Sequence, residues 1–129
     1  MTVEANAPAE AVTYCHCNDC RRLSGAPVAA FAAFAENAVS FRPDKGRFHS
    51  STSGVNRWSC PECGTQLAAT YDYLPGQIYV PIGVFDQVAE LTPSHHSHAS
   101  SALPWLHLND DLSRSNGSGR KVLKSEDKP

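Results

Sequence analysis

Five cysteines in two short clusters constrain this chain more than any other feature of its sequence. The segment CHCNDC holds Cys15, Cys17 and Cys20, and the segment CPECG holds Cys60 and Cys63. Three thiolates on one short segment repel one another unless a cation lies between them. Zinc usually takes four ligands, so three sulfurs predict a zinc site with one position open for ligand exchange or chemistry.

The spacing of the first cluster lets its three sulfurs bind one metal ion. In an extended chain Cys15 and Cys17 point to the same side, and Cys20 can return to them after a turn through residues 18–19. His16 alternates away from its neighbours. We therefore interpret it as a residue that packs behind the cysteines, and not as a ligand.

The second cluster has the C-x-x-C spacing that lets one turn of backbone aim two sulfurs at an ion about 2.3 Å away. Pro61 fixes this turn, and Gly64 permits the positive φ that such a turn often needs. Redox-active dithiols share the spacing, so a redox pair is the alternative. We predict that Cys60 and Cys63 form half of a zinc site.

Bulk properties exclude several classes of protein. The chain has 129 residues, 41% of them hydrophobic, and a formal net charge of -2. This length supports one domain, and the charge gives no general attraction to nucleic acid or to an anionic membrane. We find no segment long and apolar enough to span a membrane and no signal-peptide pattern, and we expect a cytoplasmic protein. In that reducing compartment, clustered cysteines are typically metal ligands or reactive thiols.

Short β-prone runs between turn signals predict a mainly β fold. After an exposed lead-in, EANAPAEA, we expect a strand in AVTYCHC and two strands in APVAAFAAFAENAVSF, split near residues 36–37. A DKG turn precedes a hairpin that delivers Cys60. TQLAATYDY and QIYVPIGVFD then form strands, with Val80, Ile82 and Val84 in the core.

The C-terminal third gives weaker signals. The segment SHHSHASS, residues 94–101, is a loop by composition, although His95, His96 and His98 could bind a metal. The last expected strand is PWLHL. We predict one domain over residues 1–112 and a flexible tail over residues 113–129.

Two pairs of side chains have competing interpretations. Arg21 and Arg22 form either a solvated charged surface or a pair that lowers thiol pKa values and binds a carboxylate. Trp58 and Trp105 either line a pocket or, as we favour, belong to the core or rim of a small β domain.

Four ordered motifs together resemble the glutathione-dependent formaldehyde-activating enzyme family. They are CHCNDCRRLSG, CPECGTQL, IYVPIGVFD and PWLHLNDDL, and the resemblance runs from about Tyr14 to Asp111. It implies a Mss4-like fold, in which several small coiled antiparallel sheets surround zinc-binding cysteine loops. It also implies a catalytic, exchangeable zinc on Cys15, Cys17 and Cys20.

The resemblance further implies a structural zinc on Cys60 and Cys63 together with an upstream, Gly-flanked C-x-C strand. This sequence begins at MTVEANAPAEAV and lacks that strand. We therefore expect a family-type domain over residues 1–112 without the usual first strand. A natural start further upstream, a truncated sequence and a variant with fewer metals are the alternatives. In the first two cases, Cys60 and Cys63 could bind nothing or recruit one of the other cysteines.

The implied activity joins glutathione and formaldehyde to give S-(hydroxymethyl)glutathione, which is classed as a carbon-sulfur lyase reaction from its reverse direction. Arg21 and Arg22 are then candidates for binding a glutathione carboxylate. The expected partners are glutathione and formaldehyde or a related carbonyl, without nucleic acid or membrane, and a homo-oligomer is left open. The alternatives are a glutathione carrier, a non-catalytic zinc-stabilised binding module and a redox protein using Cys60 and Cys63.

Overall fold

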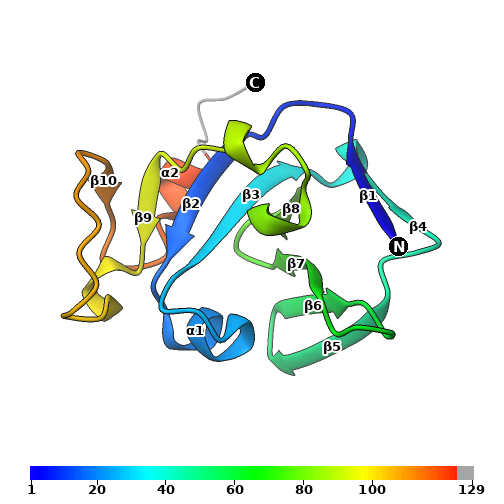
Figure 1. The fold of residues 1–129 in the computed structure, drawn as a ribbon, viewed down its shortest axis with the longest axis horizontal. Helices are drawn as coiled ribbons and strands as arrows, with labels where there is room; N and C mark the ends of the chain where they lie inside the picture. Colours follow the sequence, from blue (N-terminus) through cyan, green and yellow to red (C-terminus); the bar gives the residue numbers. More distant parts are fainter. Residues whose placement is uncertain (125–129) are drawn as a thin grey trace.

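The computed structural model describes residues 1–124, and its fold is mainly β, as predicted (Figure 1). The strands are β1 (Thr2–Ala5), β2 (Ala11–Cys15), β3 (Ala29–Ala35), β4 (Val39–Arg42), β5 (Arg47–Thr52), β6 (Val55–Ser59), β7 (Gln66–Tyr71), β8 (Gln77–Pro81), β9 (His95–Ser97) and β10 (Ser113–Arg114). The α-helices are α1 (Asn18–Ser24) and α2 (Arg120–Leu123), and short 3-10 helices cover Glu36–Ala38, Ile82–Val84, Val88–Glu90 and Ala99–Ser101.

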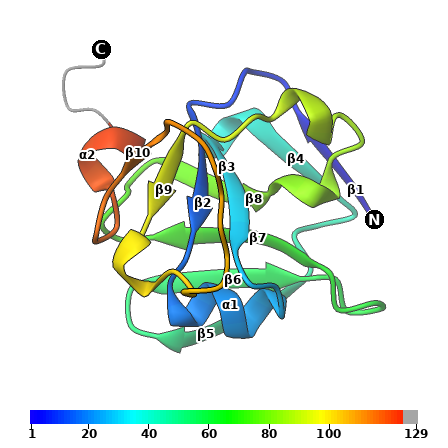
Figure 2. The same ribbon diagram turned by 60° about the vertical axis from the view of Figure 1, so that its left-hand side comes forward.

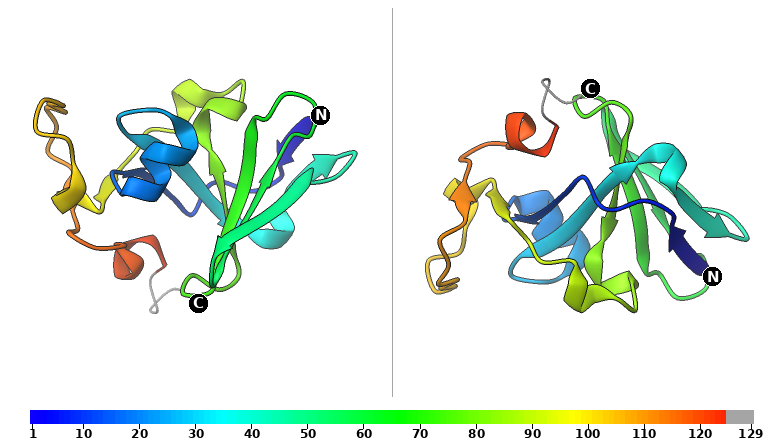
Figure 3. Two further views of the ribbon diagram at one scale, coloured as in Figure 1. Left: turned by 90° about the horizontal axis from the view of Figure 1, so that it is seen from below. Right: turned by 90° about the horizontal axis from the view of Figure 1, so that it is seen from above.

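Most strands join one curved sheet with the order β10-β9-β2-β3-β8-β7-β6-β5. From β2 to β5 every neighbouring pair is antiparallel, whereas β9 joins β2, and β10 joins β9, in parallel. Figure 2 shows β2, β3 and β9 crossing β5, β6 and β7 at a steep angle. A second sheet pairs β1 with β4, at the opposite end of the molecule from β9 and β10 (Figure 3).

The central strand β3 is buried on both faces. Phe31 and Ala33 belong to a core cluster on one face, and Ala32 and Phe34 belong to a cluster on the other. A strand covered on both sides shows no alternation of apolar and polar residues. The segment AAFAAFA therefore lacks the alternation typical of a strand, and its many alanines are more typical of a helix, although it forms β3.

Several local predictions are confirmed. The segment after residue 28 forms β3 and β4, separated by the 3-10 helix Glu36–Ala38. The hairpin of β5 and β6 leads directly to Cys60, and Gly64 adopts a φ of 78°. Val80 is fully buried, as expected for the core.

Other predictions are wrong. The strand that begins at Gln77 ends at Pro81, and Ile82 and Val84 lie in a 3-10 helix where they are only partly buried. The first two residues of the expected lead-in, Glu4 and Ala5, belong to β1, whose register to β4 pairs Thr2 with Arg42 and Ala5 with Val39. PWLHL forms no strand in the described chain, because its backbone makes turns and joins neither sheet.

The His/Ser-rich segment also differs from the expectation of a loop. Residues 95–97 form β9, which lies between β2 and β10 and is buried. Hydrogen bonds between the two ring nitrogens of His95 and the hydroxyls of Ser113 and Ser115 make this burial tolerable for a polar ring.

The expected flexible tail differs over its described part. Residues 113–114 form β10 against β9, and α2 follows with Leu123 buried in the core. The backbone carbonyl of Leu123 accepts a hydrogen bond of 3.1 Å from the Gln77 side chain, which holds α2 against β8. The remainder of the tail, residues 125–129, lies outside the described residues.

Within residues 1–124, no helix has both the length and the apolar character needed to cross a bilayer.

Candidate functional site

The structure brings the sulfur atoms of Cys15, Cys17 and Cys20 together. Their Sγ atoms all lie within 4.8 Å of one another, and those of Cys15 and Cys17 are 3.5 Å apart. Cys15 and Cys20 are buried, whereas Cys17 is half-buried. Within the described part of the chain, this is the single group of three or more histidine, cysteine or acidic side chains close enough to share an ion.

Two elements position these sulfurs. Cys15 ends β2, and Cys17 caps the N-terminus of α1, where its Sγ accepts a hydrogen bond of 3.3 Å from the Cys20 backbone N–H. The turn expected at residues 18–19 is therefore the first turn of a helix. That helix ends at Gly25, whose φ of 70° allows its N–H to donate to the Arg21 carbonyl at 2.8 Å.

Without a metal, the three thiols share one negative charge. Hydrogen bonds from Cys15 and Cys20 lower the pKa of the Cys17 thiol to about 2. The hydrogen bond to Cys17 raises the pKa of Cys15 to about 11, and hydrogen bonds to Cys15 and Cys17 raise that of Cys20. The cluster therefore holds one thiolate and two thiols at neutral pH.

A small cavity of about 30 Å³ lies beside Cys15. Its walls are mostly aromatic and apolar, and they come from strands, turns and α2, far apart in the sequence: Thr13, Phe31, Tyr71, Tyr73, Leu74, Tyr79, Ser97, His98, Ser118 and Leu123. A volume of this size suits one water or a molecule with very few heavy atoms. The tyrosines carry no local sequence motif and meet Cys15 only in the folded chain, so they could not be predicted from the sequence.

His98 is the member of this wall with an unusual backbone. Its φ of 53° makes it the one residue other than glycine with a positive φ among the described residues. Its ring also lies close enough to Cys17 to help lower the pKa of that thiol. Of the histidine group 95, 96 and 98, His98 is thus the member that faces the cysteine site.

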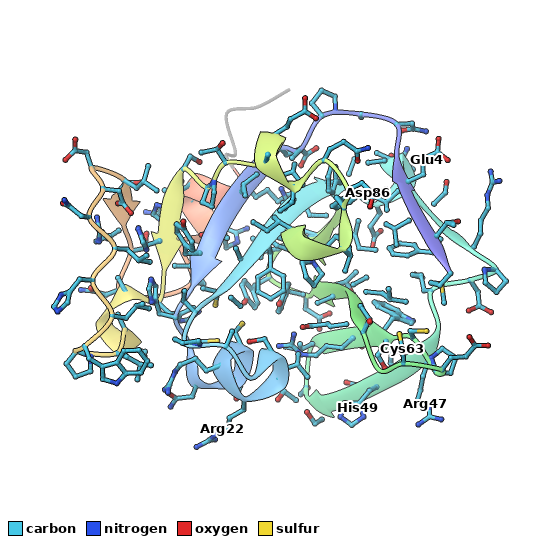
Figure 4. The ribbon with its side chains drawn as sticks, viewed as in Figure 1. Glu4, Arg22, Arg47, His49, Cys63 and Asp86 are labelled. Carbon is cyan, nitrogen blue, oxygen red and sulfur yellow. The ribbon has the colours of Figure 1, made fainter. Side chains whose placement is uncertain are left out.

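The two arginines after the cluster have different surroundings. Arg21 donates a hydrogen bond to the Asn18 side chain. Arg22 lines an open pocket of about 290 Å³ between α1 and the β5–β6 hairpin, together with His49 and Arg57. Figure 4 shows Arg22 projecting from α1 and His49 from β5, both toward the bottom of the view.

Arg57 connects this pocket with the cysteine site. Its guanidinium carbon lies 5.9 Å from the ring centre of Tyr71, which lines the cavity beside Cys15. Its Nη1 atom is buried and has no hydrogen-bond partner within residues 1–124. A buried cationic donor without a partner is costly, and an anionic ligand would satisfy it.

Cys60 and Cys63 form the expected turn but lie apart from the first cluster. The Gly64 N–H donates to the Cys60 carbonyl and the Cys60 N–H to the Thr65 carbonyl, both at 2.8 Å. Cys60 is buried and Cys63 is exposed, at the position labelled in Figure 4. No third ligand from the described residues joins this pair.

The other side chains singled out from the sequence lie away from the sulfurs. His16 is buried outside the cysteine cluster, as expected for a packing residue. Trp58 packs against Phe48 and lies under the Lys45 amine, 4.1 Å from its ring centre. Trp105 is 63% exposed. The tryptophans therefore fit a place at the rim of the domain.

A family model agrees with the resemblance drawn from the motifs. The model of the glutathione-dependent formaldehyde-activating enzyme matches residues 1–101, which is more than half of the chain. The chain belongs to this family. The mainly β fold around a cysteine cluster agrees with the Mss4-like fold of the glutathione-dependent formaldehyde-activating enzymes. No curated protein matches the sequence.

The matched region of the formaldehyde-activating family includes both cysteine clusters, α1 and β9. The segment that carries Asp110, β10 and α2 follows it. Those later elements nevertheless contribute Ser118 and Leu123 to the cavity beside Cys15. The candidate site of this family member is therefore completed by residues outside the match.

Proposed function

We propose that this protein binds glutathione at a zinc site formed by Cys15, Cys17 and Cys20 and promotes its addition to formaldehyde. The observation that carries the proposal is the convergence of three sulfurs within 4.8 Å of one another beside a cavity of about 30 Å³. The family match supports glutathione and formaldehyde as the substrates.

The donor set fits zinc in chemistry and number. Soft thiolate ligands favour zinc among the common divalent ions, and three protein ligands leave the fourth position open, as in catalytic zinc sites. Cys17 already carries the negative charge of the cluster, while Cys15 and Cys20 would each lose a proton on metal binding. When bound, zinc supplies a position at which a further thiol is held deprotonated near neutral pH.

The proposed reaction forms one carbon-sulfur bond. The glutathione sulfur attacks the carbonyl carbon of formaldehyde, the carbonyl π electrons move to oxygen, and that oxygen takes a proton to become the hydroxyl of the hydroxymethyl group. The aromatic wall of the cavity, including Tyr71 and Tyr79, keeps bulk water from this carbon. The small volume favours formaldehyde over larger aldehydes.

We assign the carboxylate contacts of glutathione to the pocket beside α1. Arg22 was proposed from the sequence, and Arg57 and His49 join it in this pocket. The unpartnered Nη1 of Arg57 supports an anionic ligand there. Arg21 is less suited to bind a glutathione carboxylate, because its guanidinium already donates a hydrogen bond to the Asn18 side chain.

We also propose that Cys60 and Cys63 are half of a second metal site. The cavity and arginine pocket favour a small anionic thiol over nucleic acid or a membrane as the partner. A cytoplasmic location would keep the thiols reduced. A glutathione carrier that accelerates nothing is the second candidate, because the uncatalysed addition also proceeds.

Exchange spectroscopy by NMR on a mixture of glutathione and formaldehyde tests the proposal. We expect the zinc-loaded protein to accelerate the interconversion of glutathione and S-(hydroxymethyl)glutathione, and the Cys17→Ser variant to lose that acceleration. Glutathione binding without acceleration would support the carrier. An absence of glutathione binding by zinc-loaded protein would contradict both.

A further inference from the structure

A chain of hydrogen bonds runs from the half-buried Asp110 through the buried His96 to His16, the residue between Cys15 and Cys17. The Asp110 carboxylate lies 3.0 Å from His96 Nε2, and His96 Nδ1 lies 2.9 Å from His16 Nε2. His16 is 4% exposed and His96 is 1% exposed. Their rings are nearly parallel, with 21° between the planes, and the ring of Tyr14 packs on His96 at 4.8 Å.

The partners fix the direction of each hydrogen bond. A carboxylate only accepts, so His96 Nε2 carries a proton and donates to Asp110. In a neutral His96 the Nδ1 atom is then an acceptor, and His16 Nε2–H donates to it. His16 Nδ1 is left without a proton, buried and without a partner among the described residues. The ring of His16 is thus held by the one hydrogen bond that it donates to His96 of β9.

His16 occupies the middle of the metal-binding segment. Its ring is buried against His96 while the sulfurs on either side of it, from Cys15 and Cys17, lie 3.5 Å apart. Its backbone N–H also donates to the Ser97 carbonyl of β9 at 3.1 Å. Rotation of this segment would separate the two sulfurs, and it would also break both contacts with β9.

Asp110, at the end of this chain of hydrogen bonds, is itself held in place. Asp110 Oδ1 accepts a hydrogen bond of 3.0 Å from the Leu112 N–H and an ion pair of 3.1 Å from Arg114. The Arg114 guanidinium additionally donates to the carbonyls of Leu112 and Leu108. The hydrogen bond from His96 and the charge of Arg114 both contribute to lowering the pKa of the Asp110 carboxyl. Asp110 is therefore a charged, immobilised acceptor.

We propose that Asp110 and His96 are positioning residues for the metal centre: acting through His16, they fix the separation and direction of the Cys15 and Cys17 sulfurs. This inference rests on the proposed zinc site. It gives a function to His96 of β9 and to Asp110, neither of which is a proposed zinc ligand. Residues that orient metal ligands from behind typically contribute 10- to 100-fold in metal affinity.

The test compares zinc affinity in variants of the full chain by competition with a chromophoric chelator, and records the absorption bands of the Co²⁺-loaded protein. We expect Asp110→Ala and His96→Phe each to weaken zinc binding about tenfold and to shift the Co²⁺ bands. Asp110→Asn, which keeps an acceptor oxygen, should retain part of the affinity. Asp111→Ala, at an exposed neighbouring carboxylate, is the matched control and should match the wild type.

A double-mutant cycle separates positioning from general destabilisation. If Asp110 acts through His96, adding Asp110→Ala to His96→Phe should weaken zinc binding no further, whereas independent losses would add. Thermal unfolding of the metal-free variants shows which are folded. A folded Asp110→Ala variant with the affinity and Co²⁺ bands of the wild type would overturn the positioning role alone. A wild-type protein that binds no zinc at the cysteine cluster would overturn the proposed function as well.

Discussion

The Sγ atoms of Cys15 and Cys17 lie 3.5 Å apart, and the ring of His16, the residue between them, is buried against His96. This relationship joins the core of the domain to the cysteine cluster, its candidate metal site. Without further contacts, the sulfurs of Cys15 and Cys17 could move apart. Here β9 holds His16, which lies between them, and α1 begins immediately after Cys17. The sulfurs are therefore prepared for an ion before one binds.

Replacing Cys17 by serine should remove both zinc and glutathione binding. A hydroxyl is a poor zinc ligand in place of a thiolate, and two remaining sulfurs do not form a stable site. We expect zinc per chain to fall by about one equivalent, measured by elemental analysis, and calorimetry should show no glutathione binding. Cys63→Ser is the control for glutathione binding, because it leaves the three clustered sulfurs intact. Unchanged glutathione affinity in Cys17→Ser would refute the proposed binding site.

Zinc uptake by the cluster should release about two protons. Cys17 carries a thiolate before metal binding, whereas the pKa of Cys15 is raised to about 11 and that of Cys20 is also raised. Both thiols are protonated at neutral pH and must lose their protons to coordinate, so binding strengthens as pH rises. Calorimetry in buffers of different ionisation enthalpy counts the protons, best in a variant with Cys60 and Cys63 replaced by serine. Release of no protons would mean that Cys15 and Cys20 are not ligands.

Arg22→Ala should weaken glutathione binding about fivefold, the upper end for an ion pair at an exposed site such as Arg22. Arg57→Ala should have a larger effect, since its Nη1 is buried and lacks a partner among the described residues. Arg47→Ala, on the exposed face of β5, is the matched control. The effect should decline at high salt, which calorimetry at two ionic strengths measures. Equal affinities in Arg22→Ala and Arg47→Ala would exclude the pocket beside α1 as the carboxylate site.

The parts of the site that could be predicted from sequence are the local ones. Cys15, Cys17 and Cys20 lie within six residues of chain, so their spacing and alternation were sufficient to predict that the three sulfurs meet. The same holds for Gly64, whose positive φ follows from the turn that the second cysteine pair requires. The helix α1 was missed because its N-terminal cap is a cysteine, which is an uncommon capping residue.

The parts that could not be predicted depend on distant partners. The segment of β9 resembles a loop because histidine and serine seldom form a buried strand. His95 is nevertheless satisfied by the hydroxyls of Ser113 at 2.6 Å and Ser115 at 3.0 Å, and His96 by Asp110. Such pairing across 14 to 20 residues leaves no periodic signal. The cavity wall beside Cys15 has the same origin, since Tyr71 and Leu123 reach it from elements far apart in the sequence.

The C-terminal segment should contribute measurably to stability, in contrast to the expectation of a flexible tail. Leu123 is 4% exposed and packs in the core cluster that contains Cys15, Phe31 and Tyr79. Truncating a buried leucine to alanine typically costs 2–5 kcal/mol, so Leu123→Ala should lower the free energy of unfolding by about 3 kcal/mol. Val122→Ala, at a neighbour that is 52% exposed, should change it by less than about 1 kcal/mol. Urea denaturation of the metal-free proteins measures both, and equal effects of the two substitutions would mean that α2 does not pack on the core in solution.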